Sequence, residues 1–168
     1  MTAPPFIFDH LEPIVDVALA TLRRDLNDTI DLINAAHDDF AIDHVPDDSY
    51  FPGGLAQPAT FYPYLEVSAS DQLVSAATVA QVAWTVSTTR LIIVAWCQHV
   101  DDEVLYRSQL RYGQAIMSVV APRGALGDEV WTEEMQAVYR RRDITIEGSG
   151  EQMIGSVAIV CSLDGDEG

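Results

Sequence analysis

The densest group of reactive side chains in the sequence is the stretch CQHVDDEVLY, residues 97–106. A thiol, an imidazole and three carboxylates fall within seven residues, namely Cys97, His99, Asp101, Asp102 and Glu103. Such groups bind transition metals and transfer protons in general acid–base catalysis. The stretch could therefore be a metal site, an acid–base site, or only the turn between two elements.

The neighbouring elements favour the turn. An apolar, strand-like run ends near His99, and from Val104 onward apolar residues recur at helical spacing. The acids of residues 101–103 then lie at a helix N-terminus, where carboxylates accept hydrogen bonds from unpaired N–H groups and complement the helix dipole. We therefore expect helix capping here, a surface or internally hydrogen-bonded His99, and no catalytic or metal-binding role.

A second acidic group lies in residues 38–60, which also contain several prolines and a Gly-Gly pair. This composition disfavours helices and central strands, so we expect a long loop, which in a compact domain is usually functional or disordered. Its candidate cation ligands are Asp38, Asp39, Asp43, His44, Asp47 and Asp48. Their spacing fits neither a calcium-binding loop nor a zinc helix motif, so we expect no metal and a solvated acidic segment.

Local motifs of catalysis are absent from the sequence. It contains no G-x-S-x-G nucleophile elbow, phosphate-binding P-loop, dinucleotide-binding G-x-G-x-x-G or H-E-x-x-H zinc motif. Ser149 lies in EGSGE, a pattern that a hairpin turn explains. A triad of distant Ser, His and Asp residues would leave no such motif, but the four histidines are scattered. We expect no enzymatic activity and no cofactor.

The overall charge argues against nucleic-acid binding. The 168 residues carry a formal net charge of −17, and all nine basic residues are arginine, so the molecule repels phosphate backbones.

No apolar run reaches the roughly 20 residues that span a bilayer. The first ten residues, MTAPPFIFDH, lack the basic and apolar segments of a secretory signal. We expect a soluble protein that is not exported.

The first half of the chain predicts a helix followed by strands. Residues 9–37 form an amphipathic helix, capped by Asp9 with Glu12 three residues on. Its buried stripe is Val15, Ala18, Leu22, Leu26, Thr29 and Ile33. Residues 61–70 and 78–100 are rich in strand-forming residues, with a plausible turn at Ser87, Thr88 and Thr89.

One strand is apolar on both alternating sets of positions. Leu91, Ile93, Ala95 and Cys97 form one set, and Ile92, Val94 and Trp96 form the other. This pattern is typical of a central strand in a sheet that is covered on both faces. Cys97 and Cys161 lie far apart within apolar runs, so we expect two buried free thiols, with a disulfide as the alternative.

The second half predicts another helix and a hairpin. Pro122 with Gly124 ends this helix, and its buried stripe is Tyr106, Leu110, Gly113, Met117 and Val120, widened by Leu105, Tyr112 and Ile116. Its polar face is Arg107, Arg111, Gln114 and Ser118. Residues 131–142 fit either a short helix or a bulged extended segment, and DITIE, GSGE and MIGSVAIVCSL predict a hairpin.

Together these elements predict one α+β domain, residues 1–168. A mixed, mainly antiparallel sheet would pack against the long N-terminal helix and the second, central helix. The acidic residues at about 164–168 would form a C-terminal tail.

This order of elements resembles that of the tail terminator and related neck or tail-completion proteins of long-tailed bacteriophages. The resemblance covers nearly the whole chain, from the N-terminal helix and long loop, through the strand entering at YPYLEV and the helix starting DDEVLYRSQLRYGQAI, to the terminal hairpin. It implies a subunit of a hexameric ring that caps the tail tube, stops its polymerisation and offers a docking surface to the head's connector. It implies no cofactor and no catalytic residue. It also implies a location at the head–tail junction of the virion, and in the host cytoplasm during assembly.

Charge leads to two expectations about such a ring. Six copies at −17 each carry −102, and a channel lined with part of that charge lets DNA pass without specific binding. Ring closure needs head-to-tail interfaces between different patches. Candidate patches combine the only basic cluster with the acidic segments, and their residues are Arg140, Arg141, Arg142, Asp101, Asp102, Glu103, Asp38, Asp39, Asp43, Asp47 and Asp48. The alternative for the arginines is a solvated helix end or a salt-bridging face.

Two rival functions stay open. A head–tail adaptor or stopper protein of the neck has the same general character and differs in its partner, which is the portal or an adaptor instead of the tail-tube protein. An unrelated monomeric module would use a pocket beneath the 38–60 loop for a small ligand or substrate. In a ring protein, that loop could instead reach a neighbouring subunit.

Overall fold

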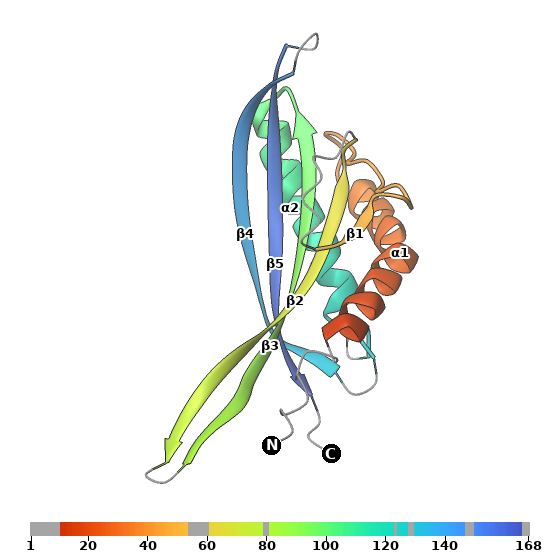
Figure 1. The fold of residues 1–168 in the computed structure, drawn as a ribbon. Coiled ribbons are helices and arrows are strands. Elements are labelled where there is room, and N and C mark those ends of the chain that lie inside the picture. Colours follow the sequence, from red (N-terminus) through yellow and green to blue (C-terminus); the bar gives the residue numbers. More distant parts are fainter. Residues whose placement is uncertain are drawn as a thin grey trace.

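Two helices pack on one face of a five-stranded sheet (Figure 1). The structure, a computed structural model, describes residues 11–53, 61–78, 81–122, 124–127, 130–146 and 150–165. Its elements are α1 (Leu11–Ala35), β1 (Tyr50–Pro52), β2 (Tyr64–Thr78), β3 (Gln81–His99), α2 (Asp102–Val120), β4 (Val130–Ile146) and β5 (Gly150–Gly165). The strand order is β1-β2-β3-β5-β4; β1 runs parallel to β2, and the other neighbours are antiparallel. This confirms the predicted α+β fold.

The core lies between the helices and one face of the sheet. Cross-strand partners share a face, and the row Val67, Ile93 and Ile159 is completely buried. Leu22 and Leu26 of α1 are buried in the same cluster. Burying a side chain of this size stabilises the fold by roughly 1.5–3 kcal/mol, so these rows hold the helices on the sheet.

The other face of β3 corrects a prediction. Ile92, Val94 and Trp96 are only half-buried, and none of the described elements covers them. The strand is central in the sheet, as predicted, but coverage of both its faces was wrong, because both helices lie on the same side. An apolar set of positions on the uncovered face therefore needs another explanation.

The strands are longer than the sequence pattern suggests. The predicted turn at Ser87, Thr88 and Thr89 is wrong: β2 and β3 pair from Tyr64↔Trp96 to Thr78↔Gln81, with one register shift between Gln72 and Leu73, opposite Ser87. Serine and threonine fit a strand ladder, and no glycine interrupts them. The two alternatives for residues 131–142 are resolved in favour of the strand, with a bulge between Thr132 and Glu134. The predicted hairpin of β4 and β5 is confirmed, although its turn lies outside the described residues.

The second helix has the predicted bounds but a rotated buried face. The acids of residues 101–103 lie at its N-terminus, as predicted, and Asp101 is the N-cap, with Oδ1 accepting from the N–H groups of Glu103 at 2.9 Å and Val104 at 3.1 Å. Two residues of the predicted stripe, Tyr106 and Leu110, are exposed. The buried face is instead Leu105, Gln109, Arg111, Tyr112, Gly113, Ala115, Ile116, Val119 and Val120. Burial of Arg111 contradicts its predicted place on the polar face.

The first helix largely agrees with its predicted stripe. Ala18, Leu22, Leu26 and Ile33 are buried, while Thr29 is half-buried and its neighbour Ile30 takes its place in the core. The predicted Asp9 cap lies outside the described residues.

The segment after α1 is anchored to the helix by two asparagine amides. Asn27 donates to Val45 O at 3.0 Å and accepts from Val45 N at 2.9 Å; Asn34 makes the same pair of bonds with Ile42, both at 2.9 Å. Seven helical residues rise about 10.5 Å and three extended residues span about 10 Å, so the two spacings match. Residues 42–45 thus run along α1 and lead to β1, which the sequence did not predict.

Candidate protein interface

The uncovered sheet face carries a continuous apolar patch. In register across β3, β5 and β4, Val94 lies beside Ala158 and Ala158 beside Val138, while Ile92 lies beside Val160. The patch, called the outer patch below, comprises Ile92, Val94, Trp96, Val138, Ala158 and Val160, all half-buried within one chain. Contiguous exposed apolar surface of this kind marks protein interfaces more often than ordinary solvent-facing sheet.

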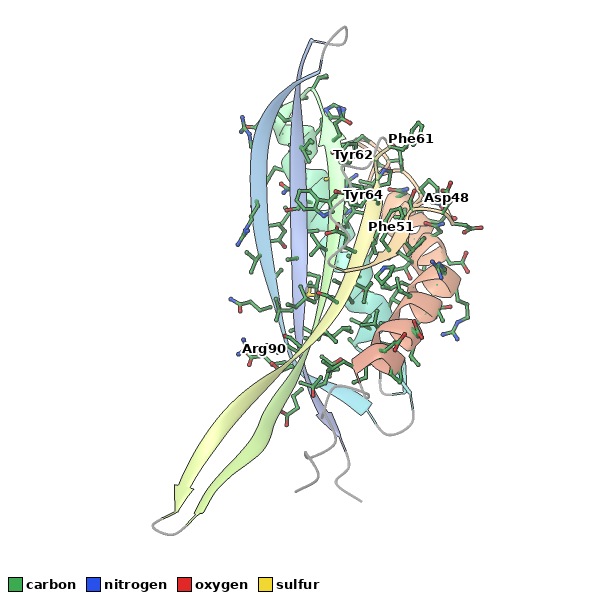
Figure 2. All side chains as sticks on the ribbon, in the orientation of Figure 1. Asp48, Phe51, Phe61, Tyr62, Tyr64 and Arg90 are labelled. Atoms are coloured by element: carbon green, nitrogen blue, oxygen red, sulfur yellow. The ribbon has the colours of Figure 1, made fainter. Side chains whose placement is uncertain are left out.

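An aromatic cluster extends the outer patch toward β1. Tyr64 stacks on Trp96 with ring centroids 5.9 Å apart, and it also contacts Phe51 and Tyr62 at 6.2 and 5.5 Å. Figure 2 shows Phe51, Tyr62 and Tyr64 gathered where β1 meets β2. Phe51 remains 37% exposed and nearby Phe61 76% exposed. Aromatic residues are enriched at protein interfaces, so this cluster fits a binding surface.

Charged groups lie both within the patch and beside it. Glu66 lies among the apolar residues and accepts a hydrogen bond from Trp96 Nε1 at 3.2 Å. Arg90, which Figure 2 labels at the far end of the face, and Arg140 are exposed. An apolar centre with a charged rim is the usual anatomy of a protein interface.

The paired strands β2 and β3 continue beyond the sheet as a two-stranded ribbon. β5 pairs with β3 only from Thr89 onward, so among the described residues the strands of 71–78 and 81–88 pair only with each other. Figure 1 shows this hairpin, in yellow and green, projecting away from the helices and from β4 and β5. The ribbon is defined below as residues 71–78 and 81–88.

The edge of the sheet at β4 is poorly suited to strand addition. Glu133, Glu134, Arg140 and Arg141 are exposed along it, and the bulge after Thr132 interrupts its regularity. Charges and bulges on edge strands prevent pairing with another chain. The sheet therefore offers its face, more than this edge, to a partner.

Arg141 contacts the acidic group of residues 101–103 within the same subunit. It lies on the helix-facing side of β4 and forms an ion pair with Asp102. Arg140 lies on the outer face, and the side chain of Arg142 is outside the described part of the chain. The predicted patches therefore meet at one point within one subunit.

Asp39 has a structural role that the sequence did not suggest. Its carboxylate forms ion pairs with Arg111 at 2.5 Å and Arg107 at 2.9 Å, and Arg107 also pairs with Glu103 at 2.5 Å. Arg111 lies over the Phe40 ring, 4.1 Å from its centroid. The hydrogen bond from Arg111 lowers the pKa of Asp39 well below its usual range. The start of the loop is thereby fixed on α2.

The remaining acidic candidates do not form a group. Asp38, Asp43, Asp47 and Asp48 are exposed, and His44 pairs with Asp31 of α1 at 2.7 Å. Among the residues that the structure describes, no group of three or more His, Cys, Asp or Glu side chains is placed to hold a metal ion.

Residues 97–99 and Val104, from the stretch CQHVDDEVLY, line a cavity of about 260 Å³ beneath the loop that follows α1. The thiol of Cys97 contacts Gly155 O at 3.6 Å, and burial raises its pKa to about 12, so it stays protonated at neutral pH. His99 accepts a hydrogen bond at Nδ1 from Asp101 N at 2.9 Å. Both cysteines are buried free thiols, as predicted. At Cys97 and His99 this geometry serves local structure and leaves no activated nucleophile.

The described helices include none long and apolar enough to cross a membrane. Comparison of the chain with models of protein families and with curated protein sequences finds no match.

Proposed function

We propose that the protein is a structural subunit of a phage particle that assembles with copies of itself into a ring, of the tail-terminator type. The ring would cap the tail tube, stop its polymerisation and join tail to head. The observation that carries the proposal is the outer patch with its aromatic cluster: a chain with a net charge of −17 leaves apolar surface uncovered on a central part of its sheet. Such surface calls for a protein partner.

The charge supports the same proposal. A hexamer built from this acidic chain would let DNA move through its channel without specific binding, because it offers phosphates few cations. The partners are then other copies of the chain, the tail-tube protein and the head–tail connector, in the virion and in the host cytoplasm during assembly. No cofactor is required.

A neck adaptor or stopper is the nearest rival. It would also need a ring and an uncovered apolar face, so only the partner separates the two. A terminator binds tail-tube protein, whereas an adaptor binds the portal or another neck protein.

The test is the mass of the purified protein by light scattering, alone and mixed with tail-tube protein from the same genome, with negative-stain images of both samples. Rings, or tubes of fixed length capped at one end, are the expected result. A chain that stays monomeric and leaves tube growth unchanged would refute the terminator role. Binding to portal or adaptor protein in the same assay would assign it to the neck.

The cavity beneath the loop supports a second candidate, a small-ligand binding module. Its volume of about 260 Å³ is near the lower end of ligand sites, and His99, Tyr112 and Ser108 give it polar groups. This candidate predicts a stable monomer whose melting temperature rises with a small ligand. A ligand screen on the monomer, with no shift for any compound class, would count against it.

A further inference from the structure

We propose that the ribbon of one copy lies across the outer patch of the next copy, so that each subunit gives one contact and receives another. This inference rests on the proposed self-association and names the two surfaces that carry it.

The ribbon is not supported by any other described strand. A two-stranded hairpin without further strands or a helix is marginally stable in water. The ribbon projects from the body, and from residue 72 to residue 89 the sequence has no Asp, Glu, Lys, Arg or His, although charged residues make up 21% of the whole chain. A projecting hairpin normally carries charges that keep it apart from other chains, so an uncharged one favours a docked state.

The register concentrates apolar residue types on one face of the ribbon. β2 and β3 pair Leu73 with Val86, Ser75 with Trp84, and Ala77 with Val82. Cross-strand partners share a face, so five of these six positions on one face are apolar residue types. The ribbon therefore has a face suited to an apolar surface.

The outer patch has a size that the ribbon can cover. Eight residues of strand extend about 26 Å, and the four strands from β2 to β4 span roughly 14 Å between the outer two axes. The ribbon is thus long enough to cross the outer patch. It continues β2 and β3 away from that patch, so it would need a sharp bend to reach the patch of its own chain. The patch of a second copy is the accessible one.

The distribution of charge makes the ribbon the segment through which two copies can approach each other. Two bodies at −17 repel each other, and an uncharged ribbon can approach where charged surfaces cannot. Because added salt screens that repulsion and leaves an apolar contact intact, association should persist or strengthen as salt rises. An interface built on the arginine cluster and the acidic segments would weaken instead.

The donor and the acceptor are different surfaces, which makes the contact head-to-tail. Contacts of this kind close into rings or continue as filaments. Because the ribbon and the outer patch are different surfaces, each of them can be removed separately.

The test uses two complementary variants. In the first, Asn-Gly replaces residues 72–88, which joins the paired residues Asp71 and Thr89 through a two-residue turn and removes the ribbon. In the second, Val94→Lys places a charge in the middle of the outer patch. Gln114→Lys, an exposed site on α2, is the control with the same charge change. Cooperative melting of each variant establishes that it folds.

We expect each variant alone to stay monomeric where the intact chain and the control assemble, with association weakened at least about 100-fold. Mixed one to one, the variants should form dimers and nothing larger, because only one intact ribbon and one intact patch remain in each pair. Assembly of the Val94→Lys variant like the intact chain, or a mixture that stays monomeric, would overturn the inference.

Two further results keep the inference separate from the proposed function. Should the ribbon deletion fail to fold, Trp84→Lys removes the apolar contact and keeps the backbone, with the same expected mixing result. An intact chain that assembles on tail tubes while both variants also do so would retain the ring and reject the ribbon contact. An intact chain that never assembles would reject both.

Discussion

Gln109 and Gly155 form a contact whose energetic coupling can be measured directly. The amide Nε2 of Gln109, buried on α2, donates to Arg140 O of β4 at 2.6 Å and to Ser156 O of β5 at 2.9 Å. A Cβ on Gly155 would lie 2.8 Å from both Cδ and Nε2 of Gln109. The φ of Gly155 is not positive. A side chain at this position is therefore opposed by space, through displacement of the Gln109 amide, and not by backbone conformation.

The magnitudes follow from these contacts. Gln109→Ala removes two hydrogen bonds, at least one of them to a buried acceptor, and should lower the free energy of unfolding by roughly 2–4 kcal/mol. Gly155→Ala forces the amide to move, and such overpacking costs about 1–3 kcal/mol. In the double variant the space is free, and Ala replaces a flexible Gly in a strand. The double variant should therefore be as stable as Gln109→Ala alone, a coupling of roughly 1–3 kcal/mol.

Urea denaturation of the four chains, followed by circular dichroism, gives the three differences in the free energy of unfolding. Gln114→Ala, on the exposed face of the same helix, is the control and should change stability by less than about 0.5 kcal/mol. Simple addition of the two single losses would refute the reasoning, because the glycine would then not be required by the amide.

Three other predictions concern single groups. The pKa of Asp39 lies below its ordinary value of 3.8, first because of Arg111; its ion pairs therefore stabilise the fold above about pH 4 and are lost as pH falls further. The difference in melting temperature between the intact chain and Asp39→Asn should accordingly shrink between pH 5 and pH 2.5, and a constant difference would contradict this. Burial raises the pKa of Cys97 to about 12 and of Cys161 to about 11, so iodoacetamide at pH 8 should label both slowly in the native chain and rapidly in urea; fast native labelling would show that the thiols are accessible. The hydroxyl of Tyr50 is buried with no hydrogen-bond partner among the described residues, so Tyr50→Phe should leave the melting temperature unchanged or raise it, and a clear fall would reveal a partner.

Local patterns predict the elements of this chain better than its contacts. The acidic N-terminus of α2 at residues 101–103 and the end of the helix before Pro122 follow from residues close in sequence, and the structure confirms both. Arg111 behaves differently, because its partners Asp39 and Phe40 lie 72 and 71 residues away. A charged residue on a helix is expected in water unless such distant partners are known.

The candidate interface was visible in the sequence but its meaning was not. The apolar set of β3 around Val94 led to the prediction that this face is covered. The sequence of one chain does not show whether its own elements or those of another molecule provide the cover. The ribbon was also hidden, because the uncharged run was divided at Ser87 to Thr89. The pairing of β2 with β3 depends on their register. Because no glycine marks a turn, the residue types along this run do not indicate where one strand ends and the next begins.

The paired amides of α1 bear on the order in which the chain folds. Asn34 and Ile42 are only 8 residues apart, and Asn27 and Val45 are 18 apart, so closing these loops costs little conformational entropy. The hairpins β2–β3 and β4–β5 are equally local. Helix and loop, and each hairpin, can thus form before they meet. We expect the slow step of folding to be the docking of these three units and α2 on one another, when distant contacts such as Arg111 with Asp39 first become possible.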